Sequence, residues 1–215
     1  MYGGSDSIRS RIALVLALGL VVLVYVPAID AWFVKDDLLL LLGAGTEPVA
    51  IFTSPWLGGF YRPLARILFG LQFTIFDLLP WPYHVVSIAI HLVCCLCVFS
   101  CARAYGVTPS TALAAMLIFG LHPGATETVA WISGQMSLVA SCGMVATLAI
   151  VLRVQRYGYN HLYALLAGVT TAVSCLCYET GTLTPLFSSV GLFGMGRERP
   201  LRVSFPVILA SVAVV

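Results

Sequence analysis

The sequence predicts an all-α membrane protein, a polytopic bundle of transmembrane helices. Of its 215 residues, 60% are hydrophobic and only 9% are charged, and the mean hydropathy is +1.00. A soluble domain carries about 25% charged residues, so a water-soluble fold would not cover this much apolar surface. Because lipid offers the backbone no hydrogen bonds, such a chain crosses the bilayer as helices or as a closed barrel. The long, unbroken apolar runs favour helices.

The first span is expected over residues 12–29, an uncharged run that follows Arg9 and Arg11. More apolar runs follow and no small-residue cleavage site is obvious, which favours an uncleaved helix over a signal peptide. Further spans are expected over residues 83–101, 110–121, 137–152, 161–177 and 182–195, with an incomplete one from residue 203. A spanning helix needs about 20 residues. Residues 1–215 are therefore expected to be the N-terminal part of one transmembrane domain, with its C-terminal remainder missing.

Residues 64–79 decide which face each later loop occupies. This segment is apolar enough to span, yet it carries Arg66, Gln72 and Asp77. With the N-terminus in the cytoplasm, a crossing here would move every arginine from Arg103 onward to the outer face, against the positive-inside rule. Without a crossing, eight of the 11 basic residues are cytoplasmic, and seven of the nine acids and all four tryptophans are outside. We therefore expect residues 30–82 to form an outer loop with interfacial helices.

Two adjacent acids, Asp36 and Asp37, follow the first span by only a few residues. Neighbouring carboxylates in a turn point in different directions, so one can contact a substrate while the other binds a metal ion or a basic partner. A carboxylate that is partly removed from water becomes a better base. The pair is a candidate catalytic site, and the alternative is a solvated pair of loop acids.

Two more acids are expected on the same face. Residues 122–134 carry Pro123 where a helix would begin, with Glu127 in its first turns, which predicts a short helix at the outer interface. Glu179 follows the end of the 161–177 span. Either acid can contribute to a site near Asp36, or can simply be a solvated residue at a helix end.

Two arginines and two histidines are further candidates. Arg62 and Arg66 are four residues apart on an expected surface helix, where they can form a phosphate clamp or reach ordinary lipid headgroups. His84, Ser87 and His91 share one face of the next helix because they are spaced at i, i+3 and i+7. For His91, the deeper of the two histidines, we expect a structural hydrogen bond to another helix. The formal charge of +2 gives no reason to expect a nucleic-acid partner.

Five short motifs together resemble a known family. They are VKDD (residues 34–37), FYRPL (60–64), YHVVSIAIH (83–91), LHPGATETVAWISG (121–134) and CYETG (177–181). Their order is similar to that in membrane glycosyltransferases of the GT-C fold, in particular bacterial relatives of tetratricopeptide-repeat-containing protein O-mannosyltransferases. The resemblance implies a GT-C-like bundle in the bacterial inner (plasma) membrane with a cytoplasmic N-terminus. It also implies a polyprenyl-phosphate-linked sugar donor and inverting transfer to a hydroxyl group of a protein or glycan on the outer face.

The resemblance also implies roles for particular residues. Asp36 or Asp37 would be the general base, and arginines would stabilise the departing lipid phosphate. The expected substrate-binding residues are Arg62, Arg66, His84, His122, Glu127 and Glu179. No metal ligands are assigned, although a divalent metal assists some members of the fold and Asp37 with Glu127 is one pair that would hold it.

Some positions depart from the family pattern. Ser87 stands where relatives tend to have Asn, Gln135 replaces a basic residue, and Tyr178 replaces a Lys before the last glutamate. These replacements favour a non-catalytic, diverged membrane subunit as one alternative. A transporter or flippase of lipid-linked sugars is another, but it needs polar groups at mid-membrane depth on several helices, and His91 is the candidate that the sequence offers.

Overall fold

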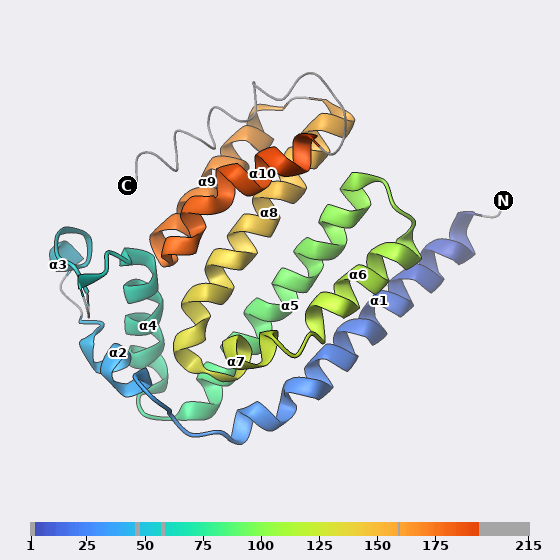
Figure 1. Cartoon of the computed structure of the whole chain (residues 1–215). Helices are drawn as coiled ribbons and strands as arrows, with labels where there is room; N and C mark the ends of the chain where they lie inside the picture. Colours follow the sequence, from blue (N-terminus) through green and yellow to red (C-terminus); the bar gives the residue numbers. More distant parts are fainter. Residues whose placement is uncertain (1–2, 46–47, 57–58, 159, 194–215) are drawn as a thin grey trace.

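The computed structural model describes residues 3–45, 48–56, 59–158 and 160–193, which form helices joined by loops and contain no β-strand (Figure 1). Three stretches are long and apolar enough to cross a membrane: Ile8–Asp30, Pro80–Tyr105 and Ile132–Tyr157. The first comprises most of α1 (Gly3–Tyr25) and the residues that follow it, the second is α5 (Pro80–Tyr105), and the third contains α8 (Gln135–Tyr157). The predicted all-α membrane helix bundle is confirmed.

Shorter helices complete the bundle. They are α6 (Pro109–Gly120), α9 (His161–Cys177) and α10 (Thr184–Phe193). With 12 residues, α6 is about 18 Å long and falls short of the roughly 30 Å hydrocarbon core that residues 110–121 were expected to cross. The end of the expected span 182–195 and the one expected from residue 203 lie outside the described residues.

The chain leaves α1 and enters α5 at the same end of the bundle. A short 3₁₀ helix, η1 (Val26–Asp30), follows α1, and the His84 Nε2–H donates a 3.1 Å hydrogen bond to the Ala31 carbonyl oxygen. Residues 31–79 therefore start and finish in one place. Within them, α2 (Asp37–Gly43), α3 (Pro48–Thr53) and α4 (Pro63–Phe76) gather beside this end (Figure 1). Hence α4 does not carry the chain to the opposite end.

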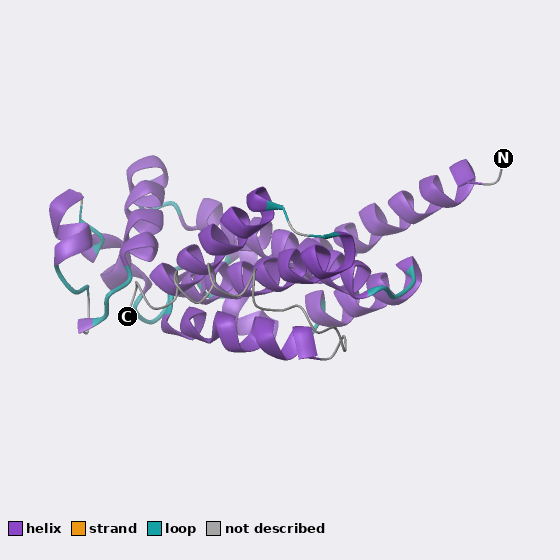
Figure 2. Cartoon of the chain, turned by 90° about the horizontal axis from the view of Figure 1, so that it is seen from above, coloured by secondary structure: helices purple, strands orange, loops and turns teal. Residues whose placement is uncertain are grey.

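Two other segments return to this end: α7 (Ala125–Ala130) with the 3₁₀ turn η3 (Ile132–Gly134), and the 3₁₀ turn η4 (Glu179–Leu183) between α9 and α10. We call residues 26–79, 121–134 and 178–183 the loop end. The opposite end holds the start of α1 and the turns that follow α5 and α8 (Figure 1). The view from above shows the helices packed side by side, with the start of the first helix extending beyond the others (Figure 2).

The interior is tightly packed between α1, α5 and α6. Gly120 makes this possible, because an added Cβ would lie 2.9 Å from both the Cys95 Sγ and the Val21 Cγ2. In return, the Gly120 carbonyl accepts a 3.0 Å hydrogen bond from His91 Nε2, and His91 is fully buried. The expected structural hydrogen bond from His91 to another helix is confirmed.

Candidate functional site

Asp37 is the first residue of α2, and its side chain is 1% exposed. Its Oδ2 accepts from the Val34 backbone N–H at 2.9 Å. Its Oδ1 accepts from the backbone N–H and the hydroxyl of Ser133 at 2.9 and 2.5 Å. Both carboxylate oxygens are thus occupied by donors of the chain itself, and the acid joins the first loop to η3.

Asp36 has the opposite environment, although it is the next residue along the chain. It is exposed, it occupies the N-cap position of α2, and its side chain makes no capping hydrogen bond. The preceding residue, Lys35, has a φ of +53°, a left-handed conformation that few L-residues adopt. The tight turn ends with Asp37 buried and Asp36 at the surface.

Lys35 extends from this turn to the third element of the site, α7. Its Nζ lies 2.8 Å from the Glu127 Oε1 and 4.2 Å from the centre of the Trp131 ring. The hydrogen bond and charge of Lys35 lower the pKa of Glu127. The structure therefore brings the acid pair and Glu127 to the same end of the bundle, as the sidedness argument requires.

Arg62 joins the start of α4 to η4. Its Nε and Nη2 donate to the two carboxylate oxygens of Glu179 at 2.7 and 2.8 Å. Its guanidinium carbon lies 4.2 Å from the Phe60 ring centre and 4.5 Å from that of Tyr178. Burial raises the pKa of Glu179, but the hydrogen bonds from Arg62, a backbone hydrogen bond and the charge of Arg62 together leave that pKa below its ordinary value.

Arg66 serves a different partner from Arg62. Its Nε donates to the Ala44 carbonyl at 2.5 Å, and its Nη1 donates to the Ala50 carbonyl at 2.9 Å and to the Ser54 hydroxyl at 3.3 Å. These bonds hold α2 and α3 against α4. The two arginines share no partner here, so the arrangement does not form the shared phosphate clamp that their spacing suggested.

The two candidate histidines also differ. His84 is 1% exposed, and its Nε2 binds the Ala31 carbonyl. His122 is exposed, and its Nδ1 accepts a 3.0 Å hydrogen bond from the Gly124 backbone N–H, which folds the turn before α7. His122 lies at the surface of the loop end, whereas His84 helps to close the first loop.

A buried amide network, which the sequence reasoning missed, joins α4, α5 and α8. Gln135 is fully buried; its Nε2 donates to the Tyr83 carbonyl at 2.9 Å and to the Ser87 hydroxyl at 3.1 Å, and its Oε1 accepts from Gln72 Nε2 at 2.8 Å. A glutamine in each of two apolar segments was the available signal. Two positions that depart from the family pattern, Ser87 and Gln135, thus contact each other.

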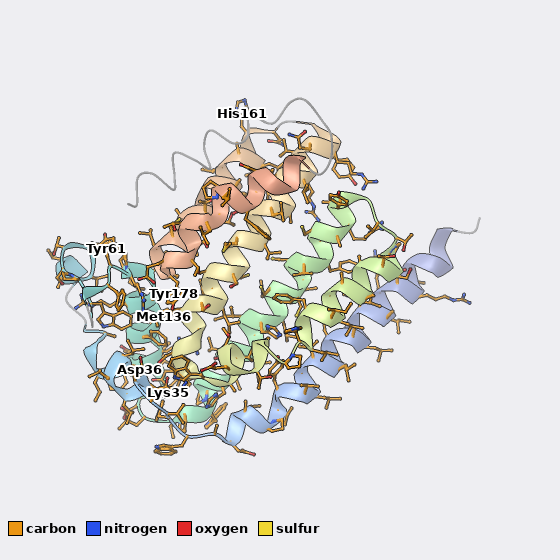
Figure 3. The ribbon with its side chains drawn as sticks, viewed as in Figure 1. Lys35, Asp36, Tyr61, Met136, His161 and Tyr178 are labelled. Carbon is orange, nitrogen blue, oxygen red and sulfur yellow. The ribbon has the colours of Figure 1, made fainter. Side chains whose placement is uncertain are left out.

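Tyr178, the third of these departures, contacts Arg62. The Met136 sulfur lies 3.7 Å from Arg62 Nη1, and the Tyr178 ring stacks on the same guanidinium. Figure 3 shows Met136 and Tyr178 near each other, above Asp36 and Lys35. The replaced positions are therefore integrated into the packing at this end.

The residues that were considered for a metal ion are used otherwise. Asp37 holds three donors of the chain, and Glu127 binds Lys35. Within the described ranges, no group of three or more His, Cys, Asp or Glu side chains is placed to hold a metal ion.

The fold and the site together define a membrane helix bundle. Its two described salt bridges, Lys35–Glu127 and Arg62–Glu179, lie at the loop end. No family model matches the chain, and no solved structure does. It is 30% identical over 192 residues to "Protein O-mannosyl-transferase Tmtc1" of Drosophila melanogaster, which is 81% of this chain and 22% of that protein. It is 28% identical over 203 residues to "Protein O-mannosyl-transferase Tmtc2" of the same fly, 83% of this chain and 22% of that protein.

A Caenorhabditis elegans protein O-mannosyl-transferase is 27% identical over 199 residues, 85% of this chain and 28% of that protein. The chain thus spans between about a fifth and a third of the length of these relatives. The comparisons relate it to proteins named O-mannosyl-transferases. All of these relatives come from animals, so they lend no support to the bacterial membrane that the motif resemblance implied.

Proposed function

We propose that this chain is part of a membrane glycosyltransferase. It moves a sugar, with inversion, from a polyprenyl-phosphate donor to a hydroxyl group of a protein or glycan acceptor. The observation that carries the proposal is the convergence of segments 34–37, 60–64, 121–134 and 177–181 at the loop end of a chain that is similar to protein O-mannosyl-transferases. The loop end faces the outer compartment, and the N-terminus is cytoplasmic.

Asp36 is the proposed general base, because its carboxylate is exposed and makes no capping hydrogen bond. It takes the proton of the acceptor hydroxyl while that oxygen bonds to the anomeric carbon of the sugar. The bond from the anomeric carbon to the phosphate oxygen breaks, and its electron pair leaves with the lipid phosphate. Asp37 supports the turn that presents Asp36, because both of its oxygens are already bound.

The other proposed site residues fall into two groups. His122 and Glu127 are exposed at the loop end and are available for contact with substrates. Arg62 and Glu179 shape the site through their bidentate pair, and Arg66 and His84 do so by fixing the first loop. No set of residues is proposed for a divalent metal.

The proposal is tested with Asp36→Asn and Asp37→Asn in membranes that contain the chain, supplied with a labelled lipid-linked mannose and a hydroxyl acceptor peptide. General-base catalysis contributes about a hundredfold or more, so Asp36→Asn should lower the transfer rate by at least that factor. Asp77→Asn is the matched control, because Asp77 is also an exposed acid at the loop end and its φ of +50° suits Asn. Wild-type transfer by Asp36→Asn would refute the role of Asp36.

A non-catalytic membrane subunit is the second candidate, favoured by Ser87, Gln135 and Tyr178, which replace the polar or charged residues of the family pattern. This candidate predicts no sugar transfer by the wild-type chain. A transporter is less favoured, because His91 is held by Gly120. A transporter would move lipid-linked sugar across the membrane of a vesicle at the same rate with or without the acceptor.

A further inference from the structure

Three described basic side chains lie at the loop end, and two of them are committed to the fold. Arg62 donates to both oxygens of Glu179 and lies between two aromatic rings, and its side chain is 11% exposed. Arg66 donates to two backbone carbonyls. An anion that took either arginine would have to break several bonds that hold the loops together.

The third cation, Lys35, is held far less tightly. Its partner is the Glu127 carboxylate, and the two side chains are 59% and 71% exposed. Ion pairs this exposed contribute little to stability, since water and salt screen them. An arriving anion can therefore take Lys35 from Glu127 without disturbing the packing of the loop end.

The chemistry of Lys35 suits a phosphate. An ammonium group is a compact charge with three N–H donors, and lysine is a common phosphate ligand. Beside it, the Trp131 ring lies 4.2 Å from Nζ and offers an apolar surface. Lys35 also directly precedes Asp36, and α-carbons of successive residues lie about 3.8 Å apart. One turn thus carries the proposed base and a readily exchanged cation.

We propose that Lys35 binds the phosphate of a polyprenyl phosphate, and that Glu127 is its partner only while the site is empty. This inference rests on the proposed function, because it supplies the cation which that reaction needs and which the two arginines do not offer. When the bond between the anomeric carbon and the phosphate oxygen breaks, the electron pair stays on the phosphate. Lys35 Nζ–H then donates a hydrogen bond to that oxygen, while the proton of the acceptor goes to Asp36.

Glu127 acts as a competitor in this scheme. Glu127 is ionised at neutral pH, and Lys35 lowers its pKa further, so the resting pair is one between full charges. The phosphate displaces the carboxylate, which remains exposed and solvated. Removal of the Glu127 charge should therefore strengthen phosphate binding, whereas a purely structural pair predicts no gain.

Binding is measured with the whole chain in phosphatidylcholine nanodiscs, with a decaprenyl phosphate, the uncharged decaprenol and inorganic phosphate as probes. Lys35→Gln removes a charged hydrogen bond to the phosphate and should weaken decaprenyl phosphate binding at least about tenfold, which corresponds to about 1.4 kcal/mol. Lys35→Arg should restore it, and Glu127→Gln should tighten it. Arg153→Gln, an exposed arginine at the opposite end, is the matched control and should bind as wild type does.

The probes separate the sources of the phosphate. Decaprenol should bind wild type and Lys35→Gln equally, and inorganic phosphate should bind more weakly than the lipid. Equal binding of inorganic phosphate and decaprenyl phosphate would overturn the assignment to a lipid. Unchanged decaprenyl phosphate binding by Lys35→Gln, or weaker binding by Glu127→Gln, would overturn the role of Lys35.

Sugar transfer measured in parallel separates this inference from the proposed function. If Asp36→Asn loses transfer but Lys35→Gln binds the lipid phosphate normally, only the inference is refuted. If neither the wild-type chain nor any variant transfers sugar, but lipid phosphate binding still depends on Lys35, the glycosyltransferase proposal is refuted and the phosphate site stands.

Discussion

Asp37 and Ser133 are 96 residues apart in the sequence and are joined by two hydrogen bonds to one carboxylate oxygen. The donors are the backbone N–H and the hydroxyl of Ser133, and the other carboxylate oxygen binds Val34 N–H. This contact fixes the turn that carries Lys35 and Asp36 to the short helical segment before α8. The proposed base and the interfacial motif 121–134 are consequently one structural unit.

Ser133→Ala removes the hydroxyl donor and leaves the backbone N–H in place. Hydrogen bonds to charged groups contribute about 1.5–3 kcal/mol, so we expect a free energy of unfolding that is lower by about that amount. Thermal unfolding in detergent measures the loss. Thr74→Ala is the control, because the Thr74 hydroxyl is exposed and donates to the Gly70 carbonyl of its own helix. Equal stability of the two variants would contradict a supporting role for Ser133.

The pair of Arg62 and Glu179 predicts a pH-dependent contribution to stability. Folding lowers the pKa of Glu179, because the hydrogen bonds and charge of Arg62, together with a backbone hydrogen bond, offset the effect of burial. A carboxyl group whose pKa is lowered by folding stabilises the fold above its unfolded pKa and loses that contribution as the pH falls through the folded value. The difference in Tm between wild type and Glu179→Gln should therefore be full at pH 7 and shrink below about pH 4.5.

Glu127→Gln is the comparison variant for this pH series. Its ion pair with Lys35 is exposed on both sides, whereas the Arg62 side chain is 11% exposed. Water screens the exposed pair more strongly, so the Tm of Glu127→Gln should stay closer to that of wild type at pH 7. A larger Tm change in Glu127→Gln than in Glu179→Gln would show that the Arg62 pair does not secure the loop end.

Gln72 and Gln135 should be energetically coupled. In a double-mutant cycle of Gln72→Ala and Gln135→Ala, we expect a coupling energy of about 0.5–1.5 kcal/mol, because one buried amide hydrogen bond joins the residues. Chemical or thermal unfolding in detergent measures it. Thr147, which bonds to Thr170 on α9, gives the control: Thr147→Ala should be additive with Gln72→Ala. Additivity in the Gln72–Gln135 cycle would mean that this hydrogen bond does not hold α4 to α8.

Labelling of single cysteines tests the sidedness of the loops. In a background in which the seven native cysteines are replaced, Lys35→Cys and Glu127→Cys should react with an impermeant maleimide from the same side of the membrane. Ser110→Cys lies in the first turn of α6, which begins at the opposite end, and should react from the other side. Labelling of positions 35 and 127 from different compartments would refute the non-crossing course of α4.

The long apolar helices were predictable, because a bilayer imposes a length and a composition that a single sequence displays directly. Charge asymmetry reports on whole loops, and it predicts that residues 64–79 do not cross the bilayer, which the cysteine labelling tests. The partners of Arg62 and Arg66 were not predictable. Their spacing suggests a shared partner, yet one arginine binds a carboxylate 117 residues away and the other binds carbonyls of the preceding loop.

The same limit applied to the acid pair. Nothing in the sequence distinguishes Asp36 from Asp37. In the structure Asp37 is buried because it binds Ser133, and the position of Ser133 depends on how η3 packs against α2. Lys35 was overlooked because a lysine in a loop is ordinary until its neighbours are known. Periodicity and composition describe one element at a time, whereas these contacts are made between elements far apart in the sequence.

The hydrogen bond from His84 to Ala31 joins residues 53 positions apart in the sequence. It holds together the two ends of the loop formed by residues 31–79. The three candidate spanning helices must match the thickness of the bilayer, whereas bilayer thickness does not limit the length of this loop. Doubling the length of a flexible loop costs only about 0.6 kcal/mol. Insertions and deletions within residues 31–79 can therefore change which substrates reach the proposed site, while the spanning helices α1, α5 and α8 keep their arrangement.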